Sequence, residues 1–219
     1  MRKKTFAAAA LLAAATLTLS ACGSQDTAGS QSPISSVSQE SGQNGPAIVF
    51  DRPWVKPDLV LTDTHGKKYD LRKETQGHPT LLYFGYTHCP DICPTTMSNI
   101  AVAAQKSLTP AQREDLRVVF VTTDPGRDTP AALGSWLKGI DPRFIGLTGD
   151  FKSVQAAARS LGISVEPTTK KDGKLVSVHG TQVMAFSPKT DGGYVMINDS
   201  ATVDDYIKDL PKLVKGAKP

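Results

Sequence analysis

Two cysteines separated by three residues are the strongest chemical signal in this sequence. Cys89 and Cys93 each precede a proline, in the stretch Gly85-Tyr-Thr-His-Cys-Pro-Asp-Ile-Cys-Pro94, and the chain of 219 residues has only one other cysteine, Cys22. If a helix begins near Asp91, both sulfurs lie at its first turn, where the helix dipole and free N–H groups favour the thiolate form. Such a pair can bind a soft metal ion or form a reversible disulfide.

Other uses of the pair fit the spacing less well. A thioredoxin-type oxidoreductase would carry Cys-x-x-Cys, with one residue fewer between the cysteines. A purely structural disulfide across so short a loop would stabilise the fold little in the chain-entropy model. The pattern therefore favours a functional pair of thiols.

A pair of thiolates favours copper(I), zinc or iron-sulfur chemistry, and two thiolates alone make an incomplete zinc site, so a third ligand is expected. The chain has four histidines. His65 lies in a turn, and His78 precedes a proline in a loop. His88 is next to Cys89, but neighbouring side chains usually point apart. His179 immediately precedes a predicted strand, and spacing alone does not select it.

The surrounding pattern predicts an α/β domain. A small hairpin is expected over residues 58–71, and further strands over 80–84, 117–122, 144–147, 181–186 and 194–197. Helices are expected from 91 to the residue before Pro110, then over 131–138, 150–161 and 202–215, with Pro211 as a kink or early stop. Strands alternating with helices build a mixed sheet, and such sheets react at the carboxyl ends of their central strands. The cysteine loop follows one such end.

Three segments together resemble one known family. The core Gly-x-Thr-His-Cys-Pro-Asp-x-Cys-Pro, then residues 121–130 (Val-Thr-Thr-Asp-Pro-Gly-Arg-Asp-Thr-Pro), then Val178-His179, are similar in order and spacing to the SCO/SenC family of copper-binding, thioredoxin-like assembly proteins. The resemblance covers nearly all of residues 47–215. It implies a thioredoxin-like fold with a mixed central sheet flanked by helices and an added N-terminal hairpin.

The resemblance also implies a ligand set. The motif cysteines and the downstream histidine of the family bind copper, which corresponds to Cys89, Cys93 and His179 here, with one copper ion per domain, as copper(I), copper(II) or both. The family's motif aspartate corresponds to Asp124, which is expected near the site as an auxiliary group. An Asp-Pro at a strand end also commonly forms a turn with its own backbone, and Arg127 with Asp128 is expected as a surface pair.

Two functions remain open on these residues. The first, which the resemblance implies, is a copper chaperone that receives copper from an upstream carrier and delivers it to the copper domain of cytochrome c oxidase subunit II. The second is a thiol-disulfide oxidoreductase that reduces the cysteines of that oxidase site and depends on an upstream reductant. We expect a metallochaperone rather than an enzyme. A peroxidase is a weaker candidate because the chain lacks an isolated cysteine in a Thr-x-x-Cys setting.

The N-terminal region predicts export. Residues 1–21 combine a basic start with an apolar, alanine-rich stretch, which is typical of a signal peptide. Leu-Ser-Ala-Cys22 resembles a lipoprotein cleavage site, so Cys22 is predicted to carry a lipid anchor. Residues 22–46 are expected to be a flexible tether, followed by the domain over 47–219 on the extracytoplasmic face of the cell membrane.

The charge balance indicates no nucleic-acid partner. Removing the signal peptide would remove Arg2, Lys3 and Lys4 and lower the formal net charge from +4 to +1. The basicity of the chain therefore belongs largely to the targeting segment.

Overall fold

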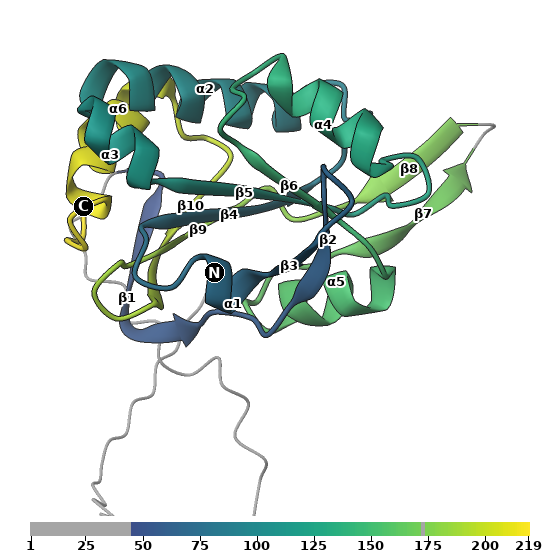
Figure 1. Cartoon of the computed structure of the whole chain (residues 1–219), viewed down its shortest axis with the longest axis horizontal. Coiled ribbons are helices and arrows are strands. Elements are labelled where there is room, and N and C mark those ends of the chain that lie inside the picture. The colour runs from purple at the N-terminus through teal and green to yellow at the C-terminus, as the bar shows by residue number, and fades with distance from the viewer. Residues whose placement is uncertain (1–44, 172–173) are drawn as a thin grey trace, which may run out of the picture. The chain divides into compact units, whose positions relative to one another are not determined.

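A mixed sheet of eight strands forms the centre of the domain (Figure 1). The computed structural model describes residues 45–171 and 174–219. The strand order is β1-β10-β9-β4-β5-β6-β2-β3. The strands are β1 (Ala47–Val55), β2 (Val60–Asp63), β3 (Lys68–Asp70), β4 (Thr80–Gly85), β5 (Arg117–Thr122), β6 (Ile145–Thr148), β9 (Val183–Phe186) and β10 (Gly192–Ile197).

Three parallel strands lie in the middle of this sheet. β4 pairs in parallel with β5, and β5 with β6, whereas the flanking strands β9 and β2 are antiparallel to their neighbours. The parallel crossovers are made by helices: α2 (Ile92–Ser107) and α3 (Pro110–Asp115) join β4 to β5, and α4 (Pro130–Lys138) joins β5 to β6. The carboxyl ends of β4 and β5 therefore meet at the same edge of the sheet.

Side chains alternate between two cores on either face of the sheet. In β4 and β5, Tyr83 and Phe120 pack on the face covered by α2, α4 and the C-terminal helix α6 (Val203–Leu213). Leu82 and Phe84 point to the other face, where α5 (Phe151–Arg159) and the short α1 (Leu71–Glu74) lie (Figure 1). Burial on both faces explains the uninterrupted apolar runs of the central strands.

A separate two-stranded sheet carries the chain back toward the cysteines. It pairs β7 (Glu166–Lys171) with β8 (Lys174–Val178) in antiparallel fashion. β8 ends at the residue before His179, so this hairpin determines how that histidine returns to the main sheet.

The structure confirms the predicted mixed sheet and hairpin and differs in local details. The hairpin expected over residues 58–71 is β2 and β3. β1 and α3 were not predicted; Thr109 caps α3 with a reciprocal capping box, so Pro110 begins a helix there. Pro211 does not end its helix, because α6 runs on to Leu213.

The predictions for the N-terminal region lie outside the described residues. They are the signal peptide over 1–21, the lipid anchor at Cys22 and all but the last residues of the tether over 22–46. Among the helices of the described part of the chain, none is both long and apolar enough to cross a membrane.

Candidate metal centre

The cysteine loop is held between a buried strand and a helix start. All residues of β4 are buried as far as Gly85, and α2 begins at Ile92 after a short loop. Cys93 lies in the first turn of α2 and is fully buried, whereas Cys89 lies in the loop and is 9% exposed. Both are free thiols. The strand and the helix thus fix both ends of the segment that carries the two sulfurs.

A sulfur caps the helix. Asp91 occupies the N-cap position of α2, but its side chain makes no capping hydrogen bond. Instead, the backbone N–H of Cys93 donates to Sγ of Cys89 over 3.4 Å. Because the first N–H groups of a helix have no partner within the helix, Cys89 supplies one of the missing acceptors. The same contact brings the two cysteine side chains together.

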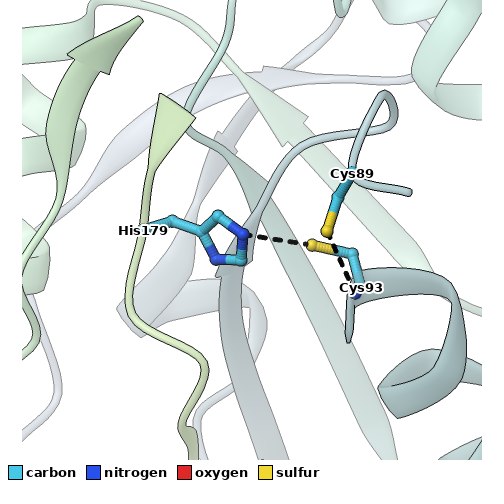
Figure 2. Close-up of side chains that lie close together, drawn as sticks. All are labelled: Cys89, Cys93 and His179. Atoms are coloured by element: carbon cyan, nitrogen blue, oxygen red, sulfur yellow. Dashed lines mark hydrogen bonds between the residues drawn. The ribbon is translucent and has the colours of Figure 1, made fainter. Parts of the chain in front are cut away.

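His179 points its free ring nitrogen at the cysteines (Figure 2). Its Nε2 lies 3.6 Å from Sγ of Cys93. Its Nδ1 lies 2.9 Å from the carbonyl oxygen of Gly180, so Nδ1 carries the proton and donates it there. The lone pair is then on Nε2, on the side of the sulfurs. Burial lowers the pKa of His179, which keeps the ring neutral and able to bind a metal.

The three ligand atoms have the spacing of a metal site. The two sulfurs and a nitrogen of His179 all lie within 4.8 Å of one another. An ion with trigonal bonds of about 2.2 Å would separate its ligand atoms by about 3.8 Å. Two thiolates with one imidazole suit copper or zinc, and the soft sulfurs favour copper(I). The donor set therefore fits the copper ion that the family resemblance implies.

Burial alters the protonation of Cys93, the more buried of the two cysteines. It raises the pKa of the Cys93 thiol to about 12, although the hydroxyl of Tyr83, which donates to this sulfur over 3.5 Å, acts in the opposite direction. The expectation that the helix start favours the thiolate is therefore wrong for Cys93 in the metal-free protein. The same burial raises the pKa of Tyr83. A metal ion that binds Cys93 must displace a proton.

Gly85 has no side chain, and Sγ of Cys93 lies close to where its side chain would be. A Cβ atom at this position would lie 2.8 Å from Sγ of Cys93 and 2.7 Å from Cε1 of Tyr83. Only glycine allows the strand to end so close to the sulfur. Sequence reasoning missed the roles of both Gly85 and Tyr83, although the alternation along β4 places Tyr83 on the face of the sheet that α2 covers.

A layer of contacts surrounds His179. The ring of Tyr86 packs edge-on against the imidazole with centroids 5.1 Å apart, and the guanidinium of Arg127 lies 6.0 Å from the centroid of that tyrosine ring. Arg127 forms an ion pair with Asp124. Asp124 is thus connected to the site through Arg127 and Tyr86, and it is not one of the three clustered ligand residues.

The prediction of a surface pair between Arg127 and Asp128 is wrong. Asp128 is fully buried, and the partner of Arg127 is Asp124. The carboxylate of Asp128 accepts hydrogen bonds from Thr87 and Thr122 instead. The pattern Asp-Pro-Gly-Arg-Asp suggested a solvated loop, but this loop folds back over the end of β5.

The other three histidines do not join the cluster. His65 is exposed in the turn after β2, and His78 pairs with Asp115 at 2.6 Å. His88 has an exposed ring whose Nδ1 lies 3.1 Å from Oγ1 of Thr87. Among the described residues, only His179 is grouped with the two cysteines as a potential metal ligand.

The fold and the site together define a thioredoxin-like domain with a Cys-Cys-His site at the carboxyl end of its central strand. The family model for SCO1/SenC matches residues 51–215. The chain therefore belongs to the SCO1/SenC family.

Relatives and solved structures agree with this assignment. An SCO2-like protein of Rickettsia conorii is 40% identical over 108 residues, which cover 49% of this chain and 51% of the relative, so the chain spans about half of that protein. The structure of Bradyrhizobium japonicum ScoI with copper bound is 31% identical, with a TM-score of 0.62, and the match covers 73% of this chain and 99% of that one.

A more distant structure supports the fold. BsSco, described as a member of the Sco family of cytochrome c oxidase assembly proteins, is 20% identical with a TM-score of 0.60. The match covers 76% of this chain and 97% of BsSco.

Proposed function

We propose that this protein is a copper chaperone that binds one copper ion through Cys89, Cys93 and His179. The observation that carries the proposal is the convergence of the three ligand atoms within 4.8 Å. Sγ of Cys93 faces Nε2 of His179, whose other nitrogen donates to a carbonyl group. Two soft sulfurs hold copper(I), and the added imidazole lets the same site accept copper(II).

The recipient in this proposal is the copper domain of cytochrome c oxidase subunit II. Membership of the SCO1/SenC family supports it, because a solved member is described as a cytochrome c oxidase assembly protein. We further propose that an upstream carrier supplies the copper and that a lipid on Cys22 anchors the domain outside the cytoplasmic membrane. The basic and apolar N-terminal sequence supports that location.

Copper titration tests the ligand set. The reduced domain should bind one equivalent of copper, and the form with a Cys89–Cys93 disulfide should bind far less. His179→Ala should weaken binding and change the copper(II) absorption spectrum. His65→Ala is the matched control because that ring is exposed in a turn. Absence of stoichiometric binding by the reduced wild type, or an unchanged spectrum in His179→Ala, would refute the assignment.

A thiol-disulfide oxidoreductase is the second candidate. The observation in its favour is the proximity of two free thiols, both buried, with Cys89 9% exposed and Cys93 fully enclosed. His179→Ala separates the two functions, because thiol exchange does not need the imidazole. Mixing copper-loaded protein with an apo oxidase copper domain should transfer copper in the wild type. If His179→Ala instead restores the oxidase site as well as the wild type does, the reductase function is correct.

A further inference from the structure

Asp128 is a fully buried carboxylate with three hydrogen-bond donors around it. Its Oδ2 accepts from the backbone N–H of Thr87 at 2.9 Å and from the hydroxyl of Thr122 at 2.6 Å. Its Oδ1 accepts from the hydroxyl of Thr87 at 2.6 Å. Burying a carboxylate is costly unless its oxygens are well supplied with donors. These bonds therefore hold Asp128 and Thr87 firmly together.

The partner of Asp128 lies in the cysteine loop. Thr87 is two residues before Cys89, whose own N–H donates to the carbonyl of Tyr86 at 3.2 Å. Asp128 itself belongs to the loop after β5, where its N–H donates to the carbonyl of Asp124 at 2.9 Å. The carboxylate therefore ties the turn that carries Cys89 to the neighbouring parallel strand.

We propose that Asp128 is a positioning residue for the metal site: through its two bonds to Thr87, it fixes the turn at residues 86–89 and so places Sγ of Cys89 beside Cys93 and Tyr86 beside His179. Asp128 contacts none of the three ligand residues, and it acts through Thr87. The inference rests on the proposed copper function for its effect on affinity, and its effect on the loop is independent of copper.

The expected loss of copper affinity follows from the way in which groups outside the ligand set hold metal ligands in place. Losing a group that hydrogen-bonds a ligand directly typically lowers metal affinity about 10- to 100-fold, and because Asp128 acts one step further out, through Thr87, a loss of about tenfold is expected. Asp128→Asn exchanges one acceptor oxygen for an amide that cannot accept, and Thr87→Val removes the hydroxyl that donates to Oδ1. Both variants should weaken copper(I) binding by that factor, measured in competition with a chromophoric copper(I) chelator. Thr87→Ser keeps the hydroxyl and should remain within about threefold of the wild type.

A metal-free measurement distinguishes positioning from general stability. In Asp128→Asn, amide hydrogen exchange should accelerate about tenfold or more at Thr87 and Cys89 and stay unchanged at Ile100 in the buried face of α2. Asp141→Asn is the matched control, because Asp141 is also a buried carboxylate but pairs with Arg143. It should lower stability and leave both copper affinity and exchange at Cys89 unchanged.

Three results would overturn the proposal. Copper affinity of Asp128→Asn equal to the wild type would do so, as would exchange that accelerates equally at Cys89 and Ile100. A loss in Thr87→Ser as large as that in Thr87→Val would also contradict it. If the wild-type protein binds no copper, the proposed function fails, and exchange at Thr87 and Cys89 alone then decides whether Asp128 positions the loop.

Discussion

Replacing Gly85 by alanine should disturb the metal site directly. The added Cβ would lie 2.7 Å from Cε1 of Tyr83, 2.8 Å from Sγ of Cys93 and 3.1 Å from Cε2 of Phe120. Ordinary contacts between such atoms are about 3.5 to 4.0 Å, so the sulfur or the strand must move by roughly 0.7 Å. All three neighbours are almost completely buried, which leaves them little room to yield.

These contacts set the expected losses of stability and of copper affinity. Overpacking a buried site typically lowers the free energy of unfolding by about 1 to 3 kcal/mol. Because metal ligands must be held within about 0.5 Å of their productive positions, a shift of this size at Sγ of Cys93 should also lower copper affinity at least tenfold. Urea unfolding of the metal-free protein measures the first effect, and copper(I) competition measures the second.

Gly126→Ala is the matched control, since a Cβ at Gly126 would meet no atom within 4 Å. It lies in the loop after β5, between Asp124 and Asp128. Gly126→Ala should change neither the free energy of unfolding nor the copper affinity appreciably. If Gly85→Ala proves as stable as Gly126→Ala and binds copper as tightly, then the end of β4 does not confine the sulfur of Cys93.

Two further predictions concern protonation and stability. Copper affinity should rise at least about tenfold per pH unit between about pH 6.5 and 8, because the pKa of Cys93 is raised and each bound ion displaces its proton. His179 does not add to this dependence, since burial lowers its pKa and keeps the ring neutral over that range. A pH-independent affinity, measured by chelator competition, would contradict the prediction. Lys56→Met should lower the free energy of unfolding by about 2 to 4 kcal/mol, since the buried ammonium of Lys56 binds Asp191 and Thr75. Copper affinity should not change, because this cluster lies at the opposite end of β4, and a loss of affinity equal to that of Gly85→Ala would refute that separation.

Features that depend on neighbouring residues were predicted well from the sequence. The apolar run of β5 was expected over residues 117–122 and has those bounds. A helix was expected over residues 131–138, and α4 runs from Pro130 to Lys138, with the side chain of Thr129 accepting from the N–H of Ala132 at its start. Such patterns express local steric and hydrogen-bonding preferences, which the tertiary structure reinforces here.

Features that depend on distant contacts were predicted poorly. β1 shows no regular alternation of buried and exposed residues, and its pairing with β10 contains an irregularity, so its pattern does not indicate a strand. The residues on either side of Asp128 in the sequence are of types that usually form solvated loops. Its burial follows from the packing of that loop against the cysteine loop, 41 residues earlier in the chain.

The sequence by itself determined that two thiols lie at the junction of a buried strand and a helix, because strand, proline and helix patterns are local. Spacing alone did not select the third ligand, and the family resemblance implied His179. The tertiary structure brings this residue, 86 positions from Cys93, to the thiols through a separate hairpin. It also decided that Cys93 is buried enough to keep its proton. Long-range packing sets the distances and the solvent exposure on which ligand geometry and thiol ionisation depend.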